Sequence, residues 1–328
     1  MMNIKTILVT GASGKLGRSL IPALLGAGYS VRATQFKTPV RIPGVKTTKG
    51  SMTDPAFIRR ALRGVDAVCH LATCKEDANN FMDVSVKGTF TLLDEARRHK
   101  RIKQLILASG DAALGIFFHS QPQPLDENAP LAAYPGYYAF SKVMEETMFA
   151  QYHIQYGLPT TTLRMSWVQD EDDLLAYMSL RPPHFGGPRW RGLATTRVQK
   201  NFFARRQNAV GCLLHPGGKP FVRHIVSVAD VADAFLLALG NRNAVGQTFN
   251  IAGPAPFSYD VLSKHIASQL DLPVVNFICR NAHDFEIDIT KARTVLGYQP
   301  QLDALQIADR AVAWRNGGGK RTKTTNAG

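Results

Sequence analysis

The sequence contains little cysteine, no long apolar run and almost nothing ahead of its first predicted strand. No run approaches the roughly 20 apolar residues that a membrane-spanning helix requires. A strand and a glycine-rich turn follow the first residues directly, so we expect neither a signal peptide nor membrane attachment. The scattered thiols argue against a disulfide framework or a zinc site, and predict a cytoplasmic protein without metal. The four cysteines are Cys69, Cys74, Cys212 and Cys279.

Acidic residues are absent from residues 174–229, within a chain whose net charge is +14. A cationic surface of this kind suits an anionic small molecule or a nucleic acid. Because the chain carries no recognised nucleic-acid module, we expect an anionic small molecule and no nucleic acid. A basic surface or an oligomer contact remains the alternative. The cations of this span are Arg181, Arg189, Arg191, Arg197, Lys200, Arg205, Arg206, Lys219 and Arg223.

Short apolar runs alternate with helical patterns through the first two thirds of the chain. Such alternation predicts an α/β fold of the Rossmann type, a doubly wound parallel sheet covered by helices on both faces. The composition, 45% hydrophobic and 20% charged, is that of an ordinary globular protein. Strands are predicted at 5–10, 29–34, 66–72, 103–109, 159–165 and, late in the chain, 247–253.

One segment, 168–222, breaks this alternation because it is rich in proline, glycine, arginine and aromatic residues. We therefore predict a smaller, partly C-terminal substrate-binding subdomain. The cofactor domain would comprise residues 1–167 and about 223–253, and the subdomain about 168–222 and 254–315. Residues 316–328 are basic and poor in apolar side chains, and predict a flexible tail.

A glycine-rich turn follows the first strand. Gly11, Gly14 and Gly17 occur at three-residue spacing, immediately before a helical pattern. Glycine permits a tight turn and a close approach to a pyrophosphate, and the N–H groups at the helix N-terminus bind the anion. The position of the turn, between strand and helix, predicts a dinucleotide cofactor. The turn also contains Ser13, Lys15 and Leu16.

The end of the second predicted strand indicates which dinucleotide is bound. An acidic residue there would bind the ribose of NAD. The chain has Gln35 at this position, with Lys37 and Arg41 nearby. These residues leave room for a 2′-phosphate and favour NADP over NAD, although the two cations could simply lie on a solvated loop.

A tyrosine and a lysine occur four residues apart in a predicted helix. Tyr138 and Lys142 therefore share one helix face, whereas Tyr137 has Ser141 at that spacing. A nearby ammonium stabilises a phenolate, which allows a tyrosine to exchange protons near neutral pH.

At this point the chain resembles the extended short-chain dehydrogenase/reductases, the group of nucleotide-sugar epimerases and dehydratases, over about residues 4–315. The resemblance implies Tyr138 as general acid/base and Lys142 as the residue that holds the nicotinamide ribose. It also implies a homodimer formed through helices in 86–97 and 141–152. Further cofactor contacts would come from Leu71, Ala72 and Thr73. Ser51 stands where the family often has an Asp near the adenine, and Met52 could still supply a backbone donor there. The matching pieces are "TGASGKLG", "DAVCHLAT", "VKGTFTLLDEA", "YYAFSK", "TTLRMSW", "RHIVSVADVADAFLLAL", "TFNIAG" and "DITKARTVLGYQP".

The chain departs from this family where a Ser or Thr usually orients the substrate, because Gly110 occupies that position. Ser109 could substitute only if the strand end bends, since successive residues of a strand point opposite ways. Asp111 is the other candidate, or it is a turn cap. Ala112 stands where dehydratases of the family carry Glu, so we rank dehydration below epimerisation and redox chemistry. Ser85 stands where the family often has Asn.

The resemblance also suggests a substrate. Arg223 matches an arginine that contacts the diphosphate of nucleotide sugars, and Arg280 loosely matches a second one. The leading interpretation is an NAD(P)-dependent epimerase or dehydrogenase acting on a nucleotide sugar. Two alternatives stay open: an NADPH-dependent ketone or aldehyde reductase of the flavonoid-reductase type, and a non-catalytic NAD(P)-binding regulator.

Overall fold

The computed structural model describes residues 1–181 and 187–319. Its centre is a seven-stranded sheet with the strand order β11-β6-β5-β4-β1-β2-β3, in which all neighbouring strands run parallel. The order reverses direction between β1 and β4, which is the switch point where doubly wound sheets bind ligands. The strands are β1 (Thr6–Thr10), β2 (Ser30–Gln35), β3 (Lys46–Lys49), β4 (Ala67–His70), β5 (Gln104–Gly110), β6 (Thr160–Met165) and β11 (Gln247–Ile251).

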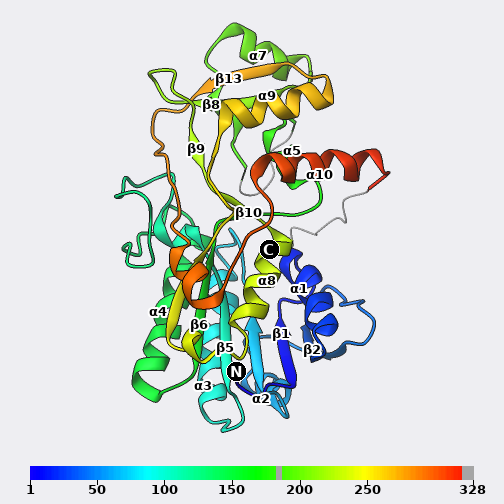
Figure 1. The fold of residues 1–328 in the computed structure, drawn as a ribbon, viewed down its shortest axis with the longest axis vertical. Helices are drawn as coiled ribbons and strands as arrows, with labels where there is room; N and C mark the ends of the chain where they lie inside the picture. The colour runs from blue at the N-terminus through cyan, green and yellow to red at the C-terminus, as the bar shows by residue number, and fades with distance from the viewer. Residues whose placement is uncertain (182–186, 320–328) are drawn as a thin grey trace.

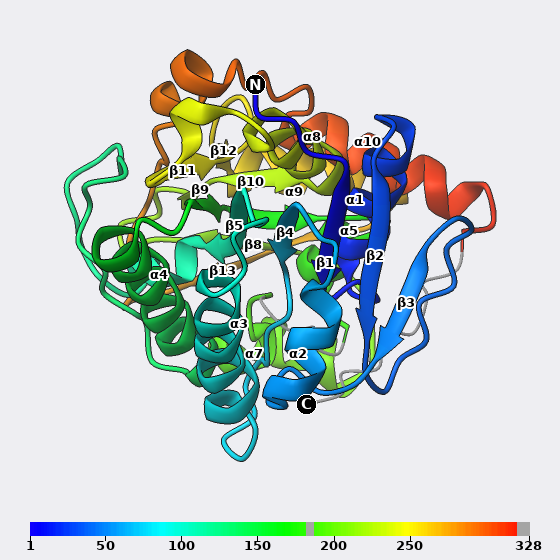
Figure 2. The ribbon, with the colours of Figure 1, turned by 90° about the horizontal axis from the view of Figure 1, so that it is seen from below.

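Helices cover both faces of this sheet. Figure 2 shows α1 (Lys15–Gly26) and α8 (Val228–Ala238) on one face. On the other face lie α2 (Pro55–Leu62), α3 (Gly88–Arg97) and α4 (Tyr137–Tyr156). The predicted Rossmann-type fold is confirmed, and six of its strands lie close to their predicted positions. The edge strand β3 was not predicted because its sequence, KTTK, contains no apolar residue.

A second hydrophobic cluster lies beyond the carboxyl ends of the strands, in the upper part of Figure 1. Its core joins buried residues between Leu174 and Ile225 to others between Phe257 and Val312, as expected if 168–222 and 254–315 pack together. The division into cofactor domain and substrate subdomain stays a prediction. The elements that carry the second hydrophobic cluster are α5 (Asp173–Met178), α6 (Trp190–Leu193), α7 (Arg197–Ala204), β8 (Val210–Leu214), α9 (Tyr259–Leu270), β13 (Val274–Ile278) and α10 (Ala304–Asn316).

Short strands connect the two parts. β7 (Trp167–Gln169) pairs parallel with β10 (Ile225–Ser227), and β9 (Val222–Arg223) pairs antiparallel with β12 (Phe257–Ser258). β7 follows the carboxyl end of β6 directly, and the guanidinium of Arg223 on β9 lies against the ring of Trp167 on β7. Single turns of other helix types complete the fold: η1 (Met82–Lys87), η2 (Asp111–Leu114), η3 (Arg242–Ala244) and η4 (Ala292–Leu296).

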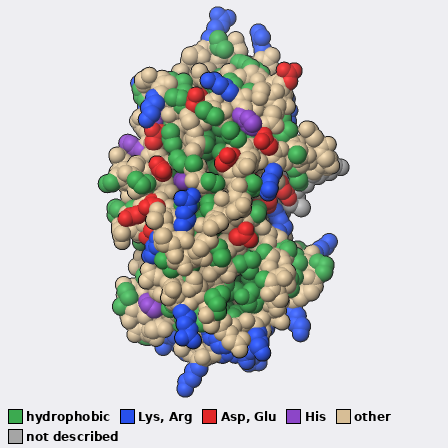
Figure 3. Space-filling view, viewed as in Figure 1, with side chains coloured by type: hydrophobic (Ala, Val, Ile, Leu, Met, Phe, Trp, Pro, Cys, Tyr) green, Lys and Arg blue, Asp and Glu red, His purple; other side chains and the backbone are tan. Residues whose placement is uncertain are grey.

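The structure also shows the charged surface and the start of the predicted flexible tail. Figure 3 shows Lys and Arg side chains projecting from both ends of this face of the molecule. Among the described helices, none is long and apolar enough to cross a membrane. Of the predicted flexible tail, Asn316 ends α10 and the Gly319 N–H donates to the Trp314 carbonyl over 3.0 Å. Residues 320–328 lie outside the described part of the chain.

Candidate functional site

The glycine turn between β1 and α1 has the geometry of a phosphate cradle. Gly11 has φ +63°, and a Cβ there would lie 2.7 Å from the Ala72 nitrogen. A Cβ on Gly17 would overlap the backbone of Ala12. Gly14 precedes α1, whose first turn receives no side-chain cap, so its N–H groups suit an anion. These glycines cannot be replaced without moving backbone, and the cradle fits a dinucleotide pyrophosphate.

Side chains around this turn tie it to the second hydrophobic cluster. Lys15 forms an ion pair with Asp173 and donates to the Val168 carbonyl over 3.1 Å. Arg18 lies 4.0 Å from Asp170. Two acidic residues at and just before the start of α5, Asp173 and Asp170, thus contact α1. Ser13 and Leu16 belong to the same turn and are half-buried.

A chain of hydrogen bonds holds the segment after β4 against the turn. Thr10 Oγ1 accepts from the N–H groups of Leu71 and Ala72, over 3.1 and 3.2 Å. Its own proton therefore goes to His70 Nδ1, 2.7 Å away. His70 Nε2 then donates to Thr89 Oγ1 over 2.9 Å. Burial lowers the pKa of His70 to about 3, so the ring is neutral.

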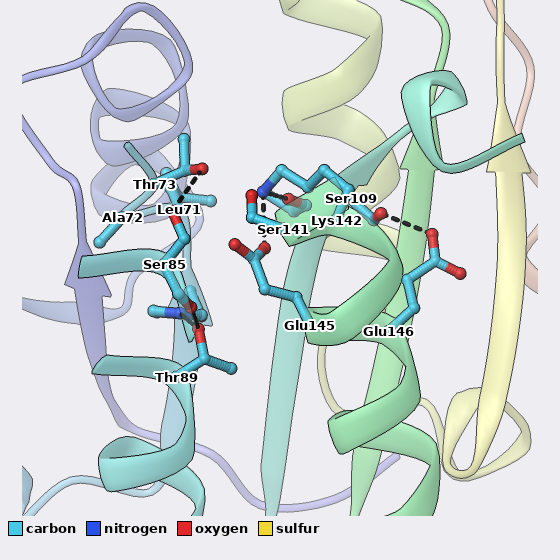
Figure 4. A network of polar contacts seen from close by, with 12 residues as sticks. Leu71, Ala72, Thr73, Ser85, Thr89, Ser109, Ser141, Lys142, Glu145 and Glu146 are labelled. Carbon is cyan, nitrogen blue, oxygen red and sulfur yellow. Dashed lines mark hydrogen bonds and ion pairs between the residues drawn. The ribbon is translucent and has the colours of Figure 1, made fainter. Parts of the chain in front are cut away.

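Ser85 extends this network toward Thr73. The Ser85 hydroxyl accepts from the Cys74 N–H over 2.7 Å and lies 3.3 Å from Thr73 Oγ1. Although Ser85 stands where the family often has Asn, it still orders the segment that follows β4. Leu71, Ala72 and Thr73 (Figure 4) thus form a fixed shelf, which lies beside the glycine turn because a Cβ on Gly11 would be 2.7 Å from the Ala72 nitrogen.

Tyr138 and Lys142 occupy the first turns of α4, above β5. The Lys142 ammonium lies 5.5 Å from the Tyr138 ring centroid. It donates to the Ala108 carbonyl over 3.0 Å and pairs with Glu145 over 2.7 Å. Burial, reinforced by the Glu145 carboxylate, raises the pKa of Tyr138 well above its usual range. Glu145 was missed at the sequence level, although its three-residue spacing from Lys142 on a predicted helix indicated contact.

The position of the missing hydroxyl lies directly beside Tyr138. A Cβ on Gly110 would be 3.5 Å from the Tyr138 Oη. Gly110 has φ −155° and ψ 162°, which is ordinary extended backbone, so the strand end does not bend. The departure noted in the sequence therefore falls at the position that faces the phenol.

Ser109 does not take over that role. Its hydroxyl donates to Glu146 over 2.5 Å, on the side of α4 away from Lys142 (Figure 4). Glu146 also binds Arg164 through two hydrogen bonds, of 3.1 and 2.7 Å. Because Ser109 belongs to this buried network, its assignment as a catalytic candidate is corrected to a structural one.

Asp111 remains the candidate at this strand end. Burial raises the pKa of its carboxyl to about 7, and the Arg223 guanidinium works in the opposite direction. Its Oδ2 atom is enclosed and has no hydrogen-bond partner in the described residues. The same charge contributes to raising the pKa of Tyr138. A carboxyl with these properties exchanges protons near neutral pH.

Arg223 faces Asp111 from a wall of aromatic side chains. Its guanidinium lies 3.6 Å from the Trp167 ring centroid, 5.4 Å from that of Phe117 and 6.0 Å from that of Phe285. Its Nε is enclosed and, within the described chain, makes no hydrogen bond. An enclosed donor of this kind suits an anionic or carbonyl group of a ligand.

The other residues that the sequence predicted for the site have the following surroundings. The Gln35 side chain accepts from the Val40 N–H over 3.0 Å, and Lys37 lies against the ring of its neighbour Phe36. Met52 is buried beside Gly88 of α3. Arg280 is exposed after β13. In residues 1–181 and 187–319, no hydrogen bond or ion pair joins Arg280 to the other candidates, and no three His, Cys, Asp or Glu side chains group as metal ligands.

Comparisons with known proteins show the family and the fold of this chain. The model of the NAD dependent epimerase/dehydratase family matches residues 7–252. The dTDP-glucose 4,6-dehydratase of Streptomyces griseus is 26% identical over 94% of this chain and 93% of its own. A short-chain dehydrogenase/reductase superfamily structure from Agrobacterium tumefaciens, with bound NAD, has a TM-score of 0.81 at 26% identity, covering 95% of this chain and 98% of its own.

A third comparison concerns the fold alone. The UDP-glucose 4-epimerase of Thermotoga maritima, solved with UDP-glucose, has a TM-score of 0.72 at 21% identity, covering 95% of this chain and 99% of its own.

Proposed function

Because the chain belongs to the NAD-dependent epimerase/dehydratase family of the extended short-chain dehydrogenases/reductases, we propose that it catalyses NAD(P)-dependent redox chemistry or epimerisation at a carbinol carbon of a nucleotide sugar. The observation that carries this proposal is the placement of Tyr138, whose Oη lies beside Gly110 at the carboxyl end of β5. When bound, the nicotinamide supplies hydride acceptance and return.

The side chains of the site have separate roles in proton transfer and in binding. Tyr138 takes the proton of the substrate hydroxyl during oxidation and returns it during reduction. Lys142 and the shelf of Leu71, Ala72 and Thr73 hold the nicotinamide riboside, and the glycine turn binds the pyrophosphate. Arg223 binds the anionic group of the substrate, and Asp111 provides a second proton-exchanging group beside it.

Substitution of the tyrosine tests this proposal. Tyr138→Phe removes the exchangeable proton and keeps the ring, so we expect turnover to fall by roughly 10²–10⁴-fold. Tyr137→Phe is the matched control, because Tyr137 is the neighbouring residue and is 43% exposed. Turnover would be measured on nucleotide sugars, free uronates and aromatic ketones with both NAD and NADP. Full activity of Tyr138→Phe on every accepted substrate would overturn the mechanism.

We also propose a preference for NADP, supported by Gln35 at the end of β2 and by the nearby Lys37. The solved relative from Agrobacterium tumefaciens contains NAD, so the two dinucleotides are to be compared directly. A higher kcat/KM with NADP supports the preference, and a higher value with NAD contradicts it. A cytoplasmic location is part of the proposal, since none of the four cysteines forms a disulfide.

A ketone reductase is the second candidate. The aromatic wall around Arg223 favours it, because flat apolar surfaces suit an aromatic ketone better than a sugar ring. Tightly held nucleotide in the purified protein would support an epimerase, and free exchange of NADPH would support a reductase.

A further inference from the structure

We propose that Glu145 is a positioning residue that neutralises Lys142 and thereby keeps Tyr138 protonated, so that the phenol serves first as a proton donor in the direction of carbonyl reduction. This inference rests on the proposed role of Tyr138 as the proton-exchanging group. It adds an acidic residue that contacts Lys142 and acts on the phenol through it.

Glu145 is the acidic partner of Lys142; burial raises the pKa of its carboxyl, and the Lys142 ammonium opposes this rise. The two side chains, 3% and 0% exposed, meet over 2.7 Å. The ammonium has a second fixed acceptor in the Ala108 carbonyl, at 3.0 Å. Both contacts fix the ammonium 5.5 Å from the centroid of the Tyr138 ring. An ion pair that carries no net charge stabilises a phenolate much less than a lone ammonium does.

The other charges around the Tyr138 phenol do not offset the effect of Glu145 on its ionisation. Besides Glu145, the carboxylates of Asp111 and Glu76 also oppose ionisation of Tyr138 and raise its pKa. Glu76 binds the N–H groups of Tyr137 and Tyr138 at the start of α4, over 2.9 and 3.4 Å.

The remaining titratable groups nearby carry little or already balanced charge. His70, on β4, is neutral because burial lowers its pKa to about 3. Glu146 is bound by Arg164 over 2.7 Å. Tyr134 is a phenol whose pKa burial raises. Lys142 is therefore the cation on which a phenolate would depend, and Glu145 is the group that cancels it.

Removal of the Glu145 carboxylate should lower the pKa of Tyr138. Glu145→Gln keeps the size of the side chain and its acceptor oxygen, but leaves the ammonium of Lys142 unneutralised. An uncovered cation at this range lowers the pKa of a phenol by about 1–3 units. The phenolate population at a given pH below the midpoint should then rise by roughly tenfold or more, since one pKa unit is a tenfold change.

The experiment follows phenolate absorbance of the full-length chain saturated with NAD during a pH titration. The spectrum of Tyr138→Phe, titrated in the same way, is subtracted to isolate the Tyr138 signal. We expect the midpoint of Glu145→Gln to lie at least one pH unit below that of the unchanged chain. Equal midpoints would overturn the role of Glu145, while the proposed function would still be decided by the Tyr138→Phe turnover assay.

A double variant provides a second test in case the Glu145→Gln chain does not fold. Lys142→Gln with Glu145→Gln replaces an ionised pair by a neutral hydrogen-bonded pair of similar shape. Because the pair has no net charge in either protein, its Tyr138 midpoint should stay within about half a unit of the unchanged chain. A midpoint well above that of the unchanged chain would show that Lys142 was not neutralised, and would contradict the inference.

Discussion

At the scale of single residues, Gly110 has no side chain where the resemblance led us to expect a Ser or Thr hydroxyl. The backbone of Gly110 is extended, and the Tyr138 Oη lies 3.5 Å from where its Cβ would be. The neighbouring Ser109 points to Glu146, because alternation along β5 turns it to the other side. The site therefore has a phenol without the adjacent hydroxyl, and next to Gly110 lies Asp111, whose carboxyl has a pKa that burial raises to about 7.

Gly110→Ser should restore that hydroxyl. Its Cβ would also lie 3.6 Å from the Met165 carbonyl and 3.9 Å from the Ala112 nitrogen, which are ordinary contacts, so the fold should tolerate it. We expect kcat/KM to be roughly tenfold higher than in Gly110→Ala, because one more hydrogen bond to the reacting oxygen contributes about 1.4 kcal/mol.

Gly110→Ala is the matched control, since it adds the same Cβ without a hydroxyl. Equal kcat/KM values for the two variants would mean that substrate orientation here does not depend on a side-chain hydroxyl beside Tyr138. Thermal unfolding of both variants would confirm that neither change alters the stability of β5.

At the scale of elements, one hydrogen-bonded histidine joins β1, β4 and α3. His70 accepts from Thr10 and donates to Thr89. Protonation would add a second N–H and remove the acceptor that Thr10 requires. The position of the Leu71–Thr73 shelf is therefore linked to the charge state of one buried ring.

This link predicts a pH dependence of stability. The pKa of His70 is lowered to about 3 in the folded chain, whereas an unfolded histidine titrates near about 6.5. The unfolded chain thus binds a proton more readily, so the His70 contribution to stability is complete above about pH 6.5 and is lost as the pH falls toward 3. The loss reaches at most about 1.4 kcal/mol per pH unit.

Urea unfolding of His70→Asn and the unchanged chain at several pH values between about 4 and 7 would measure this effect. Asn retains an acceptor and a donor without titrating, so its unfolding free energy should fall less steeply with decreasing pH. His119→Asn, at an exposed position, is the control and should keep the full slope. If the unfolding free energies of all three proteins changed equally with pH, His70 would be excluded as the source of the pH dependence.

The sequence predicted elements with strong local patterns and missed those that depend on their neighbours. Apolar runs located six of the seven strands, because a strand that is covered on both faces requires such a run. Strand β3 lies at the edge and consists of polar residues, so its pairing with β2 leaves no local pattern. Spacing identified Tyr138 and Lys142, whereas the direction of Ser109 and the ion pair of Glu145 depend on how α4 packs on β5.

At the scale of the whole molecule, α3 and α4 present large apolar side chains to solvent. Phe90 on α3 and Phe140 on α4 are 50% and 49% exposed, and Ile154 and Tyr156 on α4 are 71% and 53% exposed. The two helices pack side by side (Figure 2). We therefore propose that the homodimer expected from the resemblance forms through these helices.

Phe140→Glu combined with Phe90→Glu should therefore produce a monomer, because each charge would be buried without a partner in such an interface. Sedimentation velocity would measure the mass in solution. Val261→Glu, a change at a 52% exposed residue of α9, is the control and should leave the mass unchanged. A dimer in both variants would place the interface elsewhere, and a monomeric unchanged protein would contradict the proposal.

The second hydrophobic cluster also has a consequence for biosynthesis. Strand β8 pairs with β13, and Arg315 of α10 binds Asp172 over 2.6 Å, next to α5. Synthesis proceeds from the N-terminus, so the seven-stranded sheet has all its strands once residue 251 is made. Part of the apolar surface of α5 is then still uncovered, because α5 packs against α10, the last of the described helices to be made. Nascent chains that stop before α10 would therefore leave this apolar surface of α5 open to chaperones and proteases.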